Sequence, residues 1–163
     1  MENRETVLLK RLSTLDQETQ KEFVPDIRKW NVLGEKGYKI GFISDLWIDV
    51  AEMLVRYVEV NTEYNQLILI PIGMIAMNKK EEFVVTVDLR KSDLSKIPTH
   101  EGEVLSRDFE SQVRKSYFPN FSISGNESDF YNHNIFDERS LFGRSTREKA
   151  KKGYLESMNQ DKR

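Results

Sequence analysis

The chain has 163 residues and a formal net charge of −2, with 38% hydrophobic and 32% charged residues. This balance is typical of a globular domain with a heavily charged surface, and it argues against a protein built mainly to hold phosphate backbones. Cysteine is absent from the sequence, which excludes disulfides, thiolate metal sites and a cysteine nucleophile. No apolar run approaches the ~20 residues that span a bilayer and no signal-peptide pattern opens the chain, so we expect a cytoplasmic protein.

Residues 1–22 form a charged N-terminal extension, in which Asp16–Glu22 is predicted to be a loop. Three segments rich in aromatic and β-branched residues come later and are predicted to be strands: Tyr38–Asp49, Leu54–Val60 and Leu67–Ile72. Asn31–Leu33 is expected to pair with the first of them through a turn at Gly34–Gly37, where glycine permits a positive φ. Short loops between successive strands predict a small antiparallel β-barrel spanning residues 23–119.

Alternation within Tyr38–Asp49 predicts Ile40, Phe42 and Ser44 on one face and Gly41, Ile43 and Asp45 on the other. Proline has no N–H for a sheet ladder, so Pro71 is expected at a strand end, an edge or a bulge.

Further elements are predicted after Pro71. Asn78–Glu81 is expected to be a hairpin turn before a strand at Phe83–Leu89, and Lys91–Ile97 a single helical turn. Ser106 is a good N-cap for a helix whose apolar stripe, Phe109, Val113 and Tyr117, would lie across the barrel.

Residues 120–163 form an irregular C-terminal tail in which aromatic residues are scattered without period among polar ones. Such residues are typical of a segment that docks onto a surface, which is this barrel, a second copy of the chain or another protein; a disordered tail is the alternative. The candidate contact residues are Phe121, Phe130, Tyr131, Phe136 and Phe142.

Four sequence blocks resemble a known family: PDIRKW at Pro25–Trp30, KIGFISDLWID at Lys39–Asp49, LVRYVEV at Leu54–Val60 and LIPIG at Leu69–Gly73. The chain is similar to PRC-barrel proteins over roughly Leu12 to Phe118, and most similar to the branch of the photosynthetic reaction-centre H subunit. The resemblance implies a PRC-type β-barrel with a helix packed on it. It also marks a set of mostly structural signature residues: Asp26, Trp30, Gly37, Gly41, Asp45, Trp47, Asp49, Tyr57, Glu59, Pro71 and Gly73.

Few residues point to chemistry. His100 and His133 lie far apart in predicted loops, so we expect neither a metal site nor an acid–base role for them. Asp45 and Asp49 can share a strand face, although turn hydrogen bonding is the simpler interpretation. Glu59 lies beside Tyr57; carboxylates in the H subunit help conduct protons, but no position here matches that role. The sequence contains no phosphate-binding glycine motif.

Three functions follow from these features. We favour a non-catalytic protein-interaction or scaffolding module without a cofactor, which binds a protein partner or a second copy of itself. An accessory of photosynthetic electron transfer is the second, in which the chain would dock peripherally, because it lacks the membrane helix of the H subunit. The third is an adaptor in ribosome or RNA maturation, although the family's maturation factor carries another domain and the sequence gives no strong nucleic-acid signal.

Overall fold

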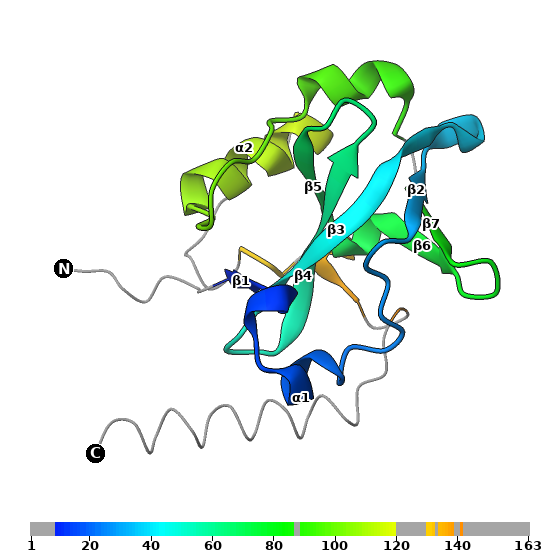
Figure 1. Ribbon diagram of the computed structural model, residues 1–163. Helices are drawn as coiled ribbons and strands as arrows, with labels where there is room; N and C mark the ends of the chain where they lie inside the picture. Colours follow the sequence, from blue (N-terminus) through cyan, green and yellow to red (C-terminus); the bar gives the residue numbers. More distant parts are fainter. Residues whose placement is uncertain (1–8, 87–88, 120–129, 133, 139–140, 142–163) are drawn as a thin grey trace.

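The computed structural model describes residues 9–86, 89–119, 130–132, 134–138 and 141. Within them, seven strands form one curled sheet that closes about half of a barrel (Figure 1). The strands are β1 (Leu9–Arg11), β2 (Asn31–Leu33), β3 (Lys39–Asp49), β4 (Leu54–Thr62), β5 (Leu67–Pro71), β6 (Ile75–Asn78) and β7 (Phe83–Thr86). The helices are α1 (Gln17–Gln20) and α2 (Arg107–Tyr117), with 3-10 turns η1 (Leu12–Thr14), η2 (Glu35–Gly37), η3 (Ile72–Met74), η4 (Lys91–Lys96) and η6 (Asn134–Phe136).

The sheet has the order β5-β4-β3-β2-β7-β6, and β1 pairs with the end of β3. The predicted mainly-β, barrel-like fold with one C-terminal helix is confirmed. The sheet is mixed rather than purely antiparallel, because β2 runs parallel to β7. The parallel pair brings together residues that are far apart in the sequence. The short connections between successive strands, which suggested a meander, therefore gave no sign of this pairing.

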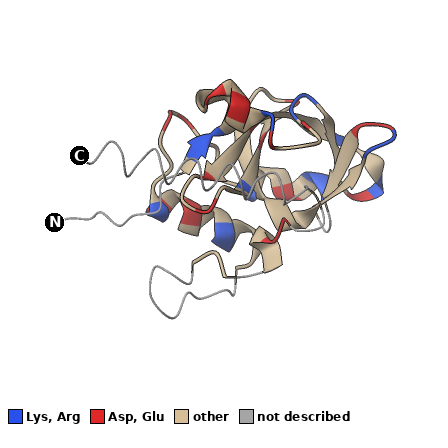
Figure 2. Ribbon diagram, turned by 90° about the horizontal axis from the view of Figure 1, so that it is seen from below, with Lys and Arg blue, Asp and Glu red and all other residues tan. Residues whose placement is uncertain are grey.

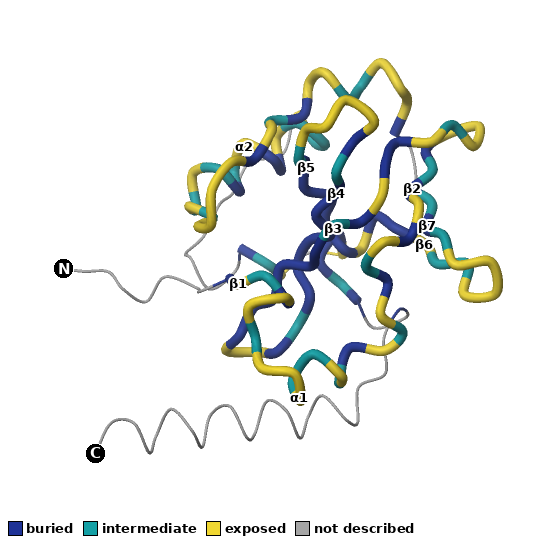
Figure 3. Tube along the Cα trace, viewed as in Figure 1, coloured by how far each residue is buried: buried dark blue, intermediate teal, exposed yellow. Residues whose placement is uncertain are grey.

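The long hairpin of β3 and β4 runs through the centre of the molecule, and most of its residues are buried (Figure 3). Ile43 lies opposite Val60, but Asp45 lies opposite Glu59, so Ser44 is the extra residue of a β-bulge. The predicted sharing of one face by Ile43 and Asp45 is therefore wrong. Asp45 instead lies on the same face of the β3–β4 hairpin as Glu59 and Tyr57.

The opposite face of this hairpin is apolar. Val58 and Val60 share it, and both are completely buried. Leu46 faces Val58, and Ile43 faces Val60, which makes this side of the hairpin part of the main hydrophobic core. Hydrophobic burial here supplies most of the force that holds the curled sheet together.

The turn before β3 and the end of β5 form as expected. Gly37 has a φ of 80° in the turn between β2 and β3, a conformation that glycine adopts without strain. Pro71 is the last residue of β5, where the absence of an N–H costs no ladder bond.

Asp16–Glu22 was expected to be a loop, and this prediction is wrong. The Asp16 carboxylate accepts a hydrogen bond from the Thr19 backbone N–H at 2.8 Å and thereby caps α1. An aspartate in this position satisfies one of the N–H groups that a helix start leaves free, which stabilises even this single turn.

Helix α2 begins as predicted, because the Ser106 hydroxyl accepts a hydrogen bond from the Phe109 N–H at 3.0 Å. Val113 is fully buried, and Phe109 and Tyr117 pack beside it against the core. Figure 1 shows the helix alongside β5.

The outer edge of β5 is covered. The Tyr117 hydroxyl donates to the Leu69 carbonyl at 2.8 Å, and the His100 N–H donates to the Leu67 carbonyl at 2.7 Å. Both carbonyls belong to an edge strand, where they would otherwise be free to pair with another strand.

Candidate functional site

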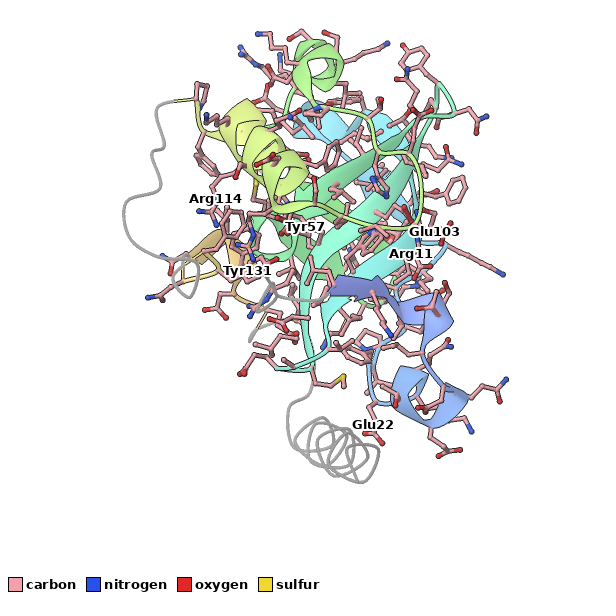
Figure 4. All side chains as sticks on the ribbon, turned by 90° about the vertical axis from the view of Figure 1, so that its left-hand side faces the viewer. Arg11, Glu22, Tyr57, Glu103, Arg114 and Tyr131 are labelled. Atoms are coloured by element: carbon pink, nitrogen blue, oxygen red, sulfur yellow. The ribbon has the colours of Figure 1, made fainter. Side chains whose placement is uncertain are left out.

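Five side chains of β4 and α2 form a surface that we call the platform: Arg56, Tyr57, Arg107, Glu110 and Arg114. The three helical residues are spaced three and four apart, so they lie on one face of α2. Arg56 is the extra residue of a second bulge, between the pairs Trp47–Tyr57 and Ile48–Val55. Arg114 and Tyr57 of the platform lie close to Tyr131 in Figure 4.

The platform holds what we call the aromatic segment, the described residues 130–132 and 134–138. Phe130 and Phe136 are each 2% exposed, so their side chains are part of the protein interior. Phe130, Tyr131 and Phe136 are the three predicted contact residues that the structure describes, and they pack on the chain's own body. Phe121 and Phe142 lie outside the described residues, as does His133.

Glu110 is the centre of the platform. Its Oε1 accepts hydrogen bonds from the Tyr57 hydroxyl at 2.8 Å and from the Tyr131 hydroxyl at 2.5 Å, and Arg107 Nε lies 3.8 Å from Oε2. Burial raises the pKa of Glu110, and the two hydroxyls and Arg107 oppose that rise. Burial also raises the pKa of Tyr57 and Tyr131, which keeps both hydroxyls protonated as donors.

Arginines lie against the rings of the aromatic segment. The guanidinium carbon of Arg107 is 3.8 Å from the centre of the Phe130 ring, and that of Arg114 is 4.0 Å from the same ring. Arg56 lies 4.4 Å from the Tyr131 ring. Contacts of this kind contribute roughly 0.5–2 kcal/mol each, so together they favour aromatic over aliphatic residues.

Backbone contacts fix the segment as well. Arg114 Nη2 donates to the Phe130 carbonyl, and the Val55 N–H donates to the Glu138 carboxylate at 2.6 Å. At Gly73, a β-carbon would overlap the carbonyl oxygen of Asn134, so only glycine allows this close approach. The segment is thus held at its start, its middle and its end.

A second polar cluster lies on β1 and β4. Arg11 Nη2 is 2.8 Å from Glu59 Oε1, and Glu103 lies 2.9 Å from Arg11 Nη1. The Arg11 guanidinium also covers the Trp47 ring at 4.8 Å, and the ring of His100 meets the ring of Trp47 edge-on at 5.4 Å. Burial lowers the pKa of His100, so its imidazole is held in the neutral form.

The carboxylates Asp45 and Asp49, considered as an acid–base pair, bind different partners. Asp45 accepts hydrogen bonds from the Ser13 hydroxyl at 2.5 Å and from the Ser13 backbone N–H at 3.2 Å. Asp49 pairs with Arg56 at 2.8 Å and accepts from the Glu52 N–H in the following turn at 3.3 Å. Asp49 therefore makes the turn hydrogen bond that the simpler interpretation predicted. Asp45 instead connects β3 to the Leu12–Thr14 turn.

The other signature residues have local structural surroundings. Asp26 pairs with Arg28 at 2.7 Å, and this contact lowers the pKa of Asp26. The Trp30 carbonyl accepts from the Ile43 N–H at 2.9 Å, which ties this buried tryptophan to β3. A β-carbon at Gly41 would overlap the Asn61 carbonyl on the neighbouring strand.

Sequence reasoning missed the platform's charged residues, although a signal for them exists. Arg107, Glu110 and Arg114 form a second stripe next to the apolar stripe that includes Phe109 and Val113. A charged stripe bordering an apolar one indicates side chains at the rim of a contact. Figure 2 shows basic and acidic positions of both signs scattered along the ribbon.

None of the helices in the described part of the chain is long and apolar enough to span a membrane. Among the same residues, no three His, Asp or Glu side chains gather as a group that could hold a metal ion.

Comparison with known families matches residues 20–94 to the PRC-barrel domain. The matched range lies within the range of the resemblance, and the match is to the domain as a whole rather than to the reaction-centre branch. It includes Arg56 and Tyr57 but ends before α2, so the other three platform residues and the aromatic segment lie beyond it. No curated protein sequence matches the chain.

Proposed function

We propose that this chain is a non-catalytic protein-interaction module, in which a PRC-barrel domain is extended by α2 and the aromatic segment. The observation that carries the proposal is the way in which the body holds residues 130–132 and 134–138. Aromatic anchors enter buried positions, arginines cover their faces, and both ends of the segment are hydrogen-bonded, through the Phe130 carbonyl and the Glu138 carboxylate. These are the contacts by which proteins recognise peptides.

The buried acids support a non-catalytic role. Glu59, Asp49 and Glu110 each have at least one basic or hydroxyl partner within hydrogen-bond distance. A general base must be within reach of a substrate proton, and these carboxylates are instead engaged by neighbouring side chains.

Affinity capture from an extract of the source cells tests the proposal. The bait is the full-length chain, and the comparison is a chain that ends at Asn120. We expect a partner to be captured in stoichiometric amount by the full chain, to rebind after purification, and to be lost on truncation. An altered mass in solution after truncation would indicate self-association instead.

The identity of the captured material decides among the partner classes: a membrane complex, the ribosome or another protein. If the truncated chain, shown to be folded by circular dichroism, captures the same partner and has the same association state, the proposed role of residues 121–163 is wrong. A substrate turned over by the purified chain would contradict the non-catalytic assignment.

A further inference from the structure

We infer that the platform is a peptide-recognition site that also accepts a segment of another protein, in place of the chain's own aromatic segment. The inference rests on the proposed function and names the chemistry of the partner. The ligand is a peptide with two adjacent aromatic residues, a third aromatic residue five positions after the second, and a carboxylate two positions further on. Phe130, Tyr131, Phe136 and Glu138 show this pattern in the chain itself.

The first two aromatic residues are specified by charge and by hydrogen bonding. Arg107 and Arg114 lie on the ring at position 130, with guanidinium carbons 3.8 and 4.0 Å from its centre. The negative face of an aromatic ring attracts these cations, whereas an aliphatic side chain does not. At position 131 a tyrosine is favoured over phenylalanine, because Glu110 is 2% exposed and accepts the Tyr131 hydroxyl at 2.5 Å.

The third aromatic residue binds by ring packing. Phe136 meets Tyr57 edge-on, with ring centres 5.4 Å apart, and it lies 4.9 Å from the Arg114 guanidinium carbon. Gly73 allows the backbone just before Phe136 to approach η3, since any β-carbon there would lie 2.7 Å from the Ile135 carbonyl carbon. A ligand must therefore present its third ring from a chain that lies flat against Gly73.

The carboxylate is specified by the start of β4. The Val55 N–H donates to Glu138 Oε1 at 2.6 Å, and Glu138 is 2% exposed. Leaving a buried N–H without an acceptor costs about 1–3 kcal/mol of free energy, so a ligand that lacks the carboxylate would bind more weakly by about that amount. Lysine or arginine at this position would also bring a positive charge to a site that already contains three arginines.

The chain's own segment competes with such a partner. A segment tethered to its site has an effective concentration of about 1 mM or more, so a free peptide binds with an apparent affinity reduced by this competition. Weakening the tethered segment while leaving the platform intact must therefore strengthen the binding of a peptide from outside. If the segment were only a permanent part of the fold, loosening it would destabilise the protein without strengthening the binding of an added peptide.

The experiment uses the full-length chain and a fluorescently labelled synthetic peptide of residues 130–141. Two variants weaken the tethered segment in different ways: Phe136→Ala removes a ring, and Glu138→Ala removes the acceptor for the Val55 N–H. Fluorescence anisotropy should show the peptide bound about tenfold more tightly by either variant than by the unaltered chain. Adding Arg114→Met to the Glu138→Ala chain should remove that gain, and a peptide with alanine at positions 130, 131 and 136 should not bind.

Circular dichroism and thermal unfolding establish which variants are folded, and Glu138→Ala carries the test if Phe136→Ala is not. Equal binding of the peptide by the unaltered and loosened chains would overturn the inference, as would no binding by any folded chain. Self-association of the loosened chains without peptide binding would also overturn it, in favour of a second copy as the occupant. If the inference fails while capture still depends on residues after Asn120, the proposed function stands and the partner uses another surface.

Discussion

Arg11 lies across the Trp47 ring to reach Glu59, with Nη2 2.8 Å from Oε1 and Nε 3.1 Å from Oε2. The two residues belong to β1 and β4, which flank β3 on opposite sides. The Glu59 side chain is 3% exposed, so it meets this guanidinium in the protein interior. The pair therefore joins the N-terminal strand to the central hairpin.

Replacing Arg11 by methionine is expected to lower the free energy of unfolding by about 3 kcal/mol, because it leaves the Glu59 carboxylate buried without its cation. Urea unfolding measures the change. Arg28→Met is the matched control: its partner Asp26 is half exposed, so the loss should stay below about 1 kcal/mol. The double variant Arg11→Met, Glu59→Leu should recover most of the lost stability, and equal losses in the two single variants would contradict this account.

Gly41→Ala is expected to destabilise the protein by about 1–3 kcal/mol, because the added methyl group overlaps a backbone carbonyl that is fixed in the β3–β4 ladder. Amide hydrogen exchange should show faster exchange in both strands near Gly41 and Thr62. Gly37→Asn serves as the control, since Gly37 has open space around it and asparagine tolerates a positive φ. The prediction fails if the alanine variant is as stable as the asparagine variant.

The pKa of Glu110 predicts how pH changes stability. Its pKa in the folded protein is raised above the ordinary value of 4.5 by burial, so in the range just above pH 4.5 the folded protein holds a proton that the unfolded chain releases. Rising pH therefore removes the stability contributed by this group. In Glu110→Gln the side-chain oxygen still accepts from Tyr57 and Tyr131 but does not titrate.

The unfolding temperature of the unaltered chain, relative to that of Glu110→Gln, should accordingly fall as pH rises from about 4 to 7. Differential scanning calorimetry on both proteins across this range measures the difference. Parallel curves would show that Glu110 has the same pKa in the folded and unfolded chains.

His100 should act in the opposite direction. Burial lowers its pKa below the ordinary value of 6.5, so as pH falls past 6.5 the unfolded chain binds a proton that the folded protein does not. The stability of the unaltered chain relative to His100→Gln should therefore decrease as pH falls from about 7 to 5. The same calorimetry series tests this, and a constant difference between the two proteins would contradict it.

Local signals in the sequence were sufficient to predict most of the elements. The β-branched and aromatic runs of β3, β4 and β5 suit a buried pleated surface, and Ser106 before the stripe of Phe109, Val113 and Tyr117 indicates a capped helix. The docking of Phe130, Tyr131 and Phe136 on the body of the protein was one of three expected surfaces, because large exposed rings gain from any burial.

The remaining features depend on contacts between distant residues. The bulge at Ser44 inserts one residue into an alternating pattern, and nothing in the pattern marks where the face changes. The parallel pairing of β2 with β7 joins positions about fifty residues apart. The partners of Glu110 come from β4 and from the aromatic segment, so its role becomes visible only when these three parts of the chain are in place.

Tyr117 and His100 have a consequence for how copies of this protein can associate. A fibril grows by strand addition only if each molecule offers two free sheet edges, one to the molecule above and one to the molecule below. With the Leu67 and Leu69 carbonyls already occupied, β5 is a poor template, and edge-to-edge growth would stop after a single pairing. The Tyr117 hydroxyl and the His100 backbone N–H thus protect the protein against fibril growth at this edge.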